Sequence, residues 1–333
     1  MSRLATFLLV VLGTFVVLML TGRMLVARSR RPRPGDSAGE SLAIGVAGWL
    51  LRLSGWLALL LVAAAMVTYI SSERTLRARH DVPLPAIPIP SDPASLARGA
   101  HLVTVLGCPA CHGKDLGGKV FYDEPGVARL VAPNLTGGLG GVGAEYSDAE
   151  FARAIRFGVR RTGHALFVMP TPEFHSLADA DLGAVIAHLR RVPPVASIVP
   201  PTRIKWLGRI GIATGRDRPS RELLPRAAPR PDVPPSGVTV EHGRYLAHAI
   251  CAECHDPTGD VTPVAKGEPP HMNVLGAYEV EGLARALRMG VAQDGRTLSP
   301  MMRPDRLGAL TDEEVAALQL YFRSRIAGAP DAS

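Results

Sequence analysis

The sequence predicts a mainly α-helical protein in which an N-terminal pair of apolar helices precedes two similar helical units. Two observations support the paired helices and the repeat. Two uncharged apolar runs occupy residues 4–20 and 53–70, and two stretches beyond residue 93 share the same order of motifs and helical patterns. A third observation concerns strands: we find no alternating pattern long enough to predict one.

The apolar runs predict a membrane anchor within residues 1–80. They contain 17 and 18 residues, which is close to the length that crosses the hydrocarbon core of a bilayer. Trp56 and Tyr69 are candidate interface anchors, and residues 41–51 either extend the second helix or lie on the membrane surface. The first run also has features of a signal peptide. However, an arginine-rich segment follows it instead of a small-residue cleavage site, which favours a retained helix.

The net charge of +7 is confined to this anchor, because residues 1–80 hold ten arginines against three acidic residues. The remaining residues are balanced, so the sequence contains no basic domain that would bind nucleic acid. Five arginines and no acidic residue lie within 23–33. The positive-inside rule therefore places this loop in the cytoplasm and residue 80 onward on the other side, although three further arginines at 74–79 oppose that orientation.

Two proline-rich segments separate the parts of the chain. Residues 81–93 contain five prolines and predict an extended spacer, and residues 196–236, rich in proline and arginine, predict a linker or wrapping strap. They bound two units at 94–195 and 237–327. Each unit predicts a helix, a cysteine motif, a long loop, a second helix, a loop and a third helix.

Capping-box spacing marks one helix start in each unit. The residue pairs are Ser147 with Glu150 and Thr311 with Glu314. We expect helices to begin directly after Ser147 and Thr311.

The four cysteines all fall in two copies of Cys-x-x-Cys-His, "CPACH" at 108–112 and "CAECH" at 251–255. This pattern attaches c-type haem: two thiols three residues apart form thioethers with one porphyrin, and the adjacent histidine ligates its iron. A four-thiolate zinc site or a thioredoxin-like redox pair would not explain the histidine. We therefore predict two covalently bound haem c groups, held by Cys108, Cys111, His112, Cys251, Cys254 and His255.

A methionine is the expected second axial ligand in each unit. Such a thioether ligand raises the reduction potential relative to two imidazoles. Met169 is the only methionine in residues 81–195 and lies in the loop before the last helix of its unit. The alternatives in this unit are His164, His175 and His188.

The second unit offers Met301 and Met302 at the corresponding place. The spacing from the upstream glycine favours Met301, whereas the spacing to the following helix favours Met302. Met272 and Met289 are weaker candidates, since core packing accounts for a methionine on a helix face.

Each unit, with its N-terminal helix, cysteine motif, methionine loop and C-terminal helix, resembles a class I cytochrome c domain. The stretch "APNLTGGLGGVGAEYSDAEFARAIRFGVRRTGHALFVMPTPEFHSLADADLGAVIAHLRRVPPV" further resembles the multihaem cytochrome c subunits of membrane-bound periplasmic dehydrogenases. The resemblance covers about residues 95–195 and, more loosely, 237–327. The family loop Pro-x-Met-Pro aligns with Pro300 and selects Met302 as the ligand. The chain departs from the family in having two motifs and an N-terminal hairpin, and in having Arg303 where the family has proline.

The resemblance implies a dihaem electron-transfer protein in the bacterial cytoplasmic membrane, with its haem domains on the periplasmic side. Its expected partners are a periplasmic dehydrogenase, a quinol-linked complex or a terminal oxidase, in a respiratory or dehydrogenase-linked chain. There are three alternatives. The chain is a dihaem redox enzyme, for example a peroxidase; or it is a cytochrome subunit of a haem-copper oxidase; or it is a haem-based sensor. Separate methionine candidates in both units favour an electron carrier over a stand-alone enzyme, because an enzyme needs an open iron site.

Overall fold

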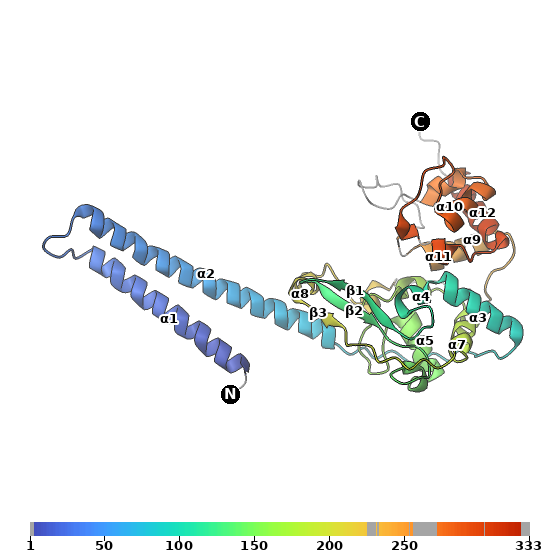
Figure 1. The fold of residues 1–333 in the computed structure, drawn as a ribbon, viewed down its shortest axis with the longest axis horizontal. Helices are drawn as coiled ribbons and strands as arrows, with labels where there is room; N and C mark the ends of the chain where they lie inside the picture. The colour runs from blue at the N-terminus through green and yellow to red at the C-terminus, as the bar shows by residue number, and fades with distance from the viewer. Residues whose placement is uncertain are drawn as a thin grey trace. The chain divides into compact units, whose positions relative to one another are not determined.

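The computed structural model describes residues 3–224, 231, 233–252, 254–255, 272–302 and 304–327. The described chain is mainly helical, as the sequence predicts (Figure 1). It divides into two compact units, Met1–Arg74 and Thr75–Ser333.

The N-terminal unit is built from α1 (Arg3–Ser29) and α2 (Ala38–Arg77). Both helices extend beyond the predicted apolar runs, and residues 41–51 continue α2. This helix begins early because Ser37 caps it: the backbone N–H of Glu40 donates to the Ser37 hydroxyl at 3.2 Å, and the Glu40 carboxylate accepts from the Ser37 N–H at 2.8 Å. The segment Val11–Ser29 and α2 are each long and apolar enough to cross a membrane.

Small residues line the contact between α1 and α2. A Cβ atom on Gly48 would lie 2.8 Å from the carbonyl oxygen of Gly22, and one on Gly55 would lie 2.8 Å from the Met19 side chain. Large apolar side chains such as Leu53 and Val67 face outward instead. Small residues between helices and large apolar residues outside are the arrangement that suits a helix pair in lipid, where backbones pack closely.

The first repeat of the second unit has the predicted order of helices (Figure 1). Its elements are α3 (Pro93–Val105), α4 (Cys108–His112), η1 (Val142–Ala144), α5 (Asp148–Phe157), α6 (Thr171–Phe174) and α7 (Asp179–Leu189). The N-terminal helix α3 crosses the C-terminal helix α7 at Gly99, where a Cβ would overlap the carbonyl oxygen of Ala184. The capping box of Ser147 and Glu150 at the start of α5 is confirmed.

The second repeat follows the same plan. Its elements are α9 (Val240–Leu246), η3 (Ala247–Cys251), η4 (Met272–Ala277), α10 (Val280–Met289), η5 (Pro300–Met302), α11 (Pro304–Leu307) and α12 (Asp312–Ala327). Helix α9 crosses α12 at Gly243, where a Cβ would overlap the carbonyl oxygen of Ala317. The capping box of Thr311 and Glu314 is also confirmed, with hydrogen bonds of 3.0 and 3.1 Å.

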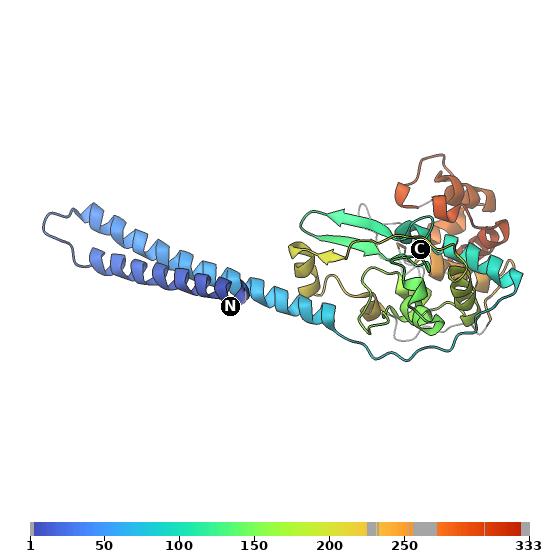
Figure 2. The same ribbon diagram turned by 60° about the horizontal axis from the view of Figure 1, so that its bottom comes forward.

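Our expectation that the chain forms no strand is wrong. An antiparallel sheet of β1 (Lys119–Glu124), β2 (Ala128–Ala132) and β3 (Arg203–Ile204) lies beside α8 (Trp206–Ala213), as Figure 2 shows. Five of the six β1 residues are exposed, so no apolar alternation marks this strand in the sequence. The segment 196–236, predicted as a linker or strap, supplies β3, α8 and η2 (Ser220–Leu223).

The proline-rich segment forms no helix or strand before α3 begins at Pro93, and it lies against the first repeat. The backbone N–H of His80 donates to the carbonyl of Gly163 at 2.8 Å. Val82 is buried, and a Cβ on Gly183 of α7 would overlap the carbonyl oxygen of Pro88. The spacer therefore covers part of the first repeat instead of crossing solvent.

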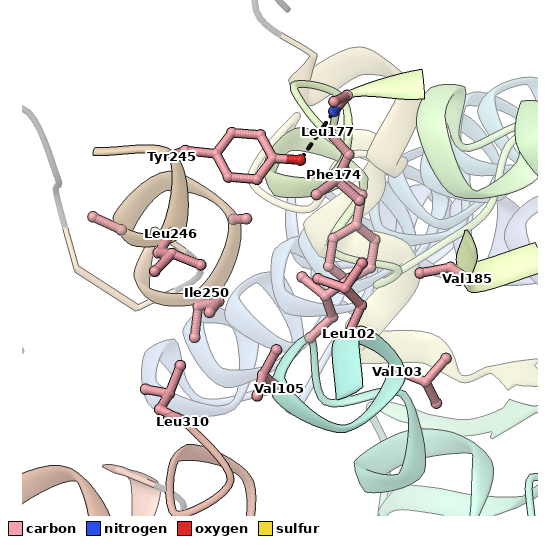
Figure 3. Close-up of a cluster of buried hydrophobic side chains, with 14 of the residues drawn as sticks. Leu102, Val103, Val105, Phe174, Leu177, Val185, Tyr245, Leu246, Ile250 and Leu310 are labelled. Atoms are coloured by element: carbon pink, nitrogen blue, oxygen red, sulfur yellow. Dashed lines mark hydrogen bonds between the residues drawn. The ribbon is translucent and has the colours of Figure 1, made fainter. Parts of the chain in front are cut away.

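The two repeats share one hydrophobic core (Figure 3). Leu102 and Val105 of α3 lie in the same cluster as Leu246 of α9, Ile250 of η3 and Leu310 ahead of α12. Burying apolar side chains from both repeats in one cluster joins them into a single folded body.

Two polar contacts at equivalent positions flank this shared core. His101 Nε2 of the first repeat lies 2.8 Å from both carboxylate oxygens of Glu314 in the second. At the equivalent position with the repeats exchanged, the hydroxyl of Tyr245 in the second repeat donates to the carboxylate of Asp181 in the first at 2.9 Å. Arg98 donates to both carboxylates, at 3.1 and 3.2 Å. The repeats therefore face each other about an approximate two-fold axis.

The Glu314 carboxyl is ionised in this interface. Burial opposes its ionisation. Hydrogen bonds from His101 and from the backbone N–H of Thr311, together with the charges of His101 and Arg98, outweigh burial and lower the pKa of Glu314 to about 2. The carboxylate therefore contributes to the contact between the repeats throughout the neutral range.

Candidate haem-binding sites

The first cysteine motif forms one turn of helix. Gly107 ends α3 with a φ of 78°, in the left-handed region, and α4 then begins at Cys108. Residues three and four apart on a helix share a face. Cys108, Cys111 and His112 are therefore on one side of α4, as two thioethers and an axial ligand to one flat ring require.

His112 has the protonation and burial of a metal ligand. Its Nδ1 lies 2.9 Å from the carbonyl oxygen of Pro133, and because that oxygen can only accept, the proton is on Nδ1 and the lone pair on Nε2. The ring is 8% exposed. Burial lowers the pKa of His112, partly offset by the Pro133 hydrogen bond, so the imidazole is neutral. The first motif therefore fits a haem c group.

The loop that supplies the Pro133 carbonyl is fixed by Asn134, which is fully buried. Its side-chain amide donates to the carbonyl of Val195 at 2.7 Å, and its side-chain oxygen accepts from the backbone N–H and the hydroxyl of Thr136 at 2.9 and 2.8 Å. This role of Asn134 is not among the predictions from the sequence. The only signal was that Asn134 lies in the "APNLTGG" segment of the resemblance.

The second motif adopts a similar turn. The backbone N–H groups of Cys254 and His255 donate to the carbonyl of Cys251 at 3.2 and 3.0 Å, which brings all three side chains to one side. The turn follows directly from η3, a π-helical segment, a type of irregularity frequent at functional sites. Residues 256–271, which follow, lie outside the described residues.

The thiols at the start of the two motifs lie in similar surroundings. Burial raises the pKa of Cys108 to about 11 and that of Cys251 to about 12, and in both cases the charge of Arg306 opposes the shift. Such thiols are not the thiolates of a redox pair. The described residues also contain no group of three or more His, Cys, Asp or Glu arranged to hold a metal ion, so the zinc alternative has no support there.

The candidate methionine ligands occupy equivalent places. Met169 and Met302 are both partly buried and pack against the shared core. Each stands two residues before a one-turn helix, α6 at Thr171 and α11 at Pro304. The side chain of Met301 lies outside the described residues.

The backbone ahead of Met169 is strained. Val168 has a φ of 72°, which a β-branched residue adopts only when the surrounding structure imposes it. Strain of this kind concentrates at functional sites.

The other candidate ligands lie in varied surroundings. His175 donates from Nδ1 to the carbonyl of Arg156 at 3.0 Å, the same kind of bond that His112 makes, so this bond does not exclude it as a ligand. His164 bonds to Thr162 at an exposed turn. Met272 is buried in the core, whereas Met289 is 69% exposed on α10. His188 remains as a partly buried residue of α7, where burial lowers its pKa.

Comparison with known proteins supports the haem assignment. No family model matches the chain. The chain is 30% identical over 181 residues to the alcohol dehydrogenase (quinone) cytochrome c subunit of Gluconobacter oxydans, covering 51% of this chain and 36% of that protein. It is 26% identical over 284 residues to the gluconate 2-dehydrogenase cytochrome c subunit of Pantoea cypripedii, covering 72% of this chain and 61% of that protein.

A third relative is the fructose dehydrogenase cytochrome subunit of Gluconobacter japonicus, which is 32% identical over 121 residues, or 32% of this chain and 24% of that protein. The chain therefore matches between about a quarter and three fifths of the length of these relatives. They are cytochrome subunits of dehydrogenases. This similarity supports haem c as the cofactor.

Proposed function

We propose that the chain is a membrane-anchored dihaem cytochrome c that transfers single electrons from a dehydrogenase to an acceptor of the respiratory chain. One observation carries the proposal: each of two equivalently folded repeats presents a Cys-x-x-Cys-His turn. In the first, Nδ1 of His112 is fixed by the Pro133 carbonyl, so that Nε2 is available to a metal.

In this proposal the thiols of Cys108 and Cys111 hold the first group, and those of Cys251 and Cys254 the second. His112 with Met169, and His255 with Met302, are the axial ligand pairs. Bound haem c supplies an iron that changes reversibly between its ferric and ferrous states by one electron.

The chain's own residues set the character of these centres. Two protein ligands on each iron leave no open position for a substrate, so they favour electron transfer over peroxidase chemistry. A thioether ligand raises the reduction potential relative to two imidazoles. Met302 is preferred to Met301 because α11 follows Met302 at the distance at which α6 follows Met169.

The anchor and its orientation are part of the proposal. Helices α1 and α2 have the length and composition to cross the bilayer. The connection between them carries three arginines, Arg30, Arg31 and Arg33, and the last turns of α1 carry Arg23 and Arg28, which favours the cytoplasmic side. The repeats then lie on the periplasmic side of the bacterial cytoplasmic membrane. The dehydrogenase partner is inferred from the names of the relatives, and a quinol-linked complex or terminal oxidase is a candidate for the other end of the path.

The test is purification from membranes together with bound partners, followed by a spectroelectrochemical titration of Met169→Ala, Met301→Ala and Met302→Ala. We expect two haems per chain, and we expect each of Met169→Ala and Met302→Ala to lower the potential of one haem while Met301→Ala changes neither. If Met301→Ala alters ligation and Met302→Ala does not, the assigned ligand is wrong. A wild-type protein with one five-coordinate iron and peroxidase turnover would replace the carrier by an enzyme.

A further inference from the structure

We propose that Arg306 is a positioning residue that joins the two haem-attachment segments and raises the reduction potentials of both centres. The proposal rests on the function proposed above. It concerns a side chain that belongs to neither cysteine motif.

Arg306 bonds to both motif segments at once. Its Nε donates to the carbonyl of Val105 at 2.7 Å, and a terminal guanidinium nitrogen donates to the carbonyl of Ile250 at 3.0 Å. Val105 stands three residues before Cys108, and Ile250 stands directly before Cys251. One planar guanidinium on α11 therefore connects the start of the first motif to the start of the second. Arginine suits this role because its donors form a rigid fork.

The first motif leaves space for this side chain. A Cβ on Gly107 would lie 3.0 Å from both Cδ and Nε of Arg306. Gly107 is required for its positive φ, and its missing side chain also admits the guanidinium beside Cys108.

The charge of Arg306 acts on both attachment sites with the same sign. It favours negative charge at the sulfur positions of Cys108 and of Cys251, against the effect of burial. Oxidation by one electron adds a positive charge to a centre, so a fixed cation nearby disfavours oxidation and raises the reduction potential. In the proposed holoprotein each of these two sulfur atoms is bonded to its own haem, so both centres would lie close to this cation.

Arg306 is not a repeated feature of the fold. It is the third residue of α11, and the third residue of the equivalent helix α6 is Glu173. The two interface carboxylates, Asp181 and Glu314, are matched across the approximate two-fold axis, whereas Arg306 is not. If Arg306 served only the packing common to both repeats, the first repeat would have a matching arginine. Its presence in one repeat alone therefore points to a role at the two attachment segments.

The decisive variant is Arg306→Gln, made in the full-length holoprotein in detergent. We expect the equilibrium constant for reduction of each centre to fall by about tenfold, which is 59 mV for a one-electron couple. Arg306→Lys keeps the charge but loses the two-carbonyl fork, so its potentials should lie close to those of the wild type while its melting temperature falls.

Arg296→Gln is the matched control, since the Arg296 side chain belongs to the same repeat, is 68% exposed and pairs with its near neighbour Asp294. Its potentials should be those of the wild type. Arg306→Met replaces Arg306→Gln if the glutamine variant does not retain two haems.

Unchanged potentials in Arg306→Gln, or a shift equal to that of Arg296→Gln, would overturn the proposal. A shift confined to one haem would also contradict it, since a shared cation must affect both. Spectra that keep His/Met ligation in these variants separate this failure from a failure of the proposed function, which the methionine variants test.

Discussion

The terminal helices of each repeat cross at a glycine. Alanine in place of glycine usually stabilises a helix, but at this crossing we expect the same change to destabilise the protein. A Cβ on Gly99 would overlap the carbonyl oxygen of Ala184 and lie 2.6 Å from its carbonyl carbon, whereas ordinary contact begins at 3.4 Å. Helix α3 must then move more than about 0.8 Å away from α7, because the carbonyl oxygen is closer still than the carbon. Overpacking of this kind costs up to about 3 kcal/mol, and the better helix propensity of alanine returns about 1 kcal/mol. We expect Gly99→Ala to lower the free energy of unfolding by about 2 kcal/mol.

Thermal unfolding of the holoprotein, followed by circular dichroism, measures this loss. For a unit of this size, 2 kcal/mol corresponds to a fall in Tm of about 4–8 °C. Gly243→Ala should behave alike, because its Cβ would meet Ala317 in the same way. Gly137→Ala is the control, since nothing lies within 4 Å of its Cβ position. A Gly99→Ala protein with a raised Tm would show that helix propensity alone decides the effect and that the crossing is looser than described.

Three further predictions concern the interface and the haem sites. Because the pKa of Glu314 is lowered to about 2, the stabilisation that its carboxylate provides is present above pH about 4.5 and is lost between pH about 4.5 and 2. Glu314→Gln should therefore flatten the pH dependence of Tm in that window. An unchanged slope would show that other carboxyl groups cause the pH dependence. Asn134→Ala leaves a buried carbonyl without its donor and should destabilise the first repeat by about 2 kcal/mol, seen as earlier loss of its haem spectrum on heating. The double variant Cys251→Ala, Cys254→Ala should retain one haem by mass and lose helicity in the second repeat; full helicity would show that haem is not part of that core.

Features that depend on neighbouring residues could be predicted from the sequence. The capping boxes of α5 and α12 involve residues three apart, and the helical turn at Cys108 follows from local spacing. The helical composition of both repeats was predictable for the same reason. The start of α2 at Ala38 was missed, although Ser37 and Glu40 have capping-box spacing, because the prediction was drawn from the uncharged run alone.

Features that depend on distant residues could not be predicted. The bond from His112 to Pro133 spans 21 residues, and the bond from Arg306 to Val105 spans 201. Strand β3 has two residues and forms only by pairing with the edge of β2. No periodicity or composition in the segment 196–236 carries that information.

The choice between Met301 and Met302 shows how structure adds to spacing. The backbone N–H groups of Leu166 and Leu298 make equivalent bonds of 2.7 Å, to Gly158 and Gly290, and counting from them pairs Met169 with Met301. Counting back from α6 and α11 pairs Met169 with Met302. The extra residue therefore lies between Leu298 and α11, within the segment that contains η5. Because only Pro170 separates Met169 from its helix, the register of α11 is the relevant one for its counterpart.

Joining two similar repeats in one chain has a consequence that a symmetric dimer could not have. In a two-fold dimer every interface residue appears twice, so a cation placed beside both cofactors would be accompanied by a second copy of itself. In this chain the positions equivalent by fold carry different residues: Tyr245 stands where the first repeat has His101, and Arg306 stands where it has Glu173. The approximate symmetry brings the two attachment segments together, and the sequence difference places one positive charge between them. Covalent linkage thus allows a single side chain, with no second copy, to act on both attachment segments at once.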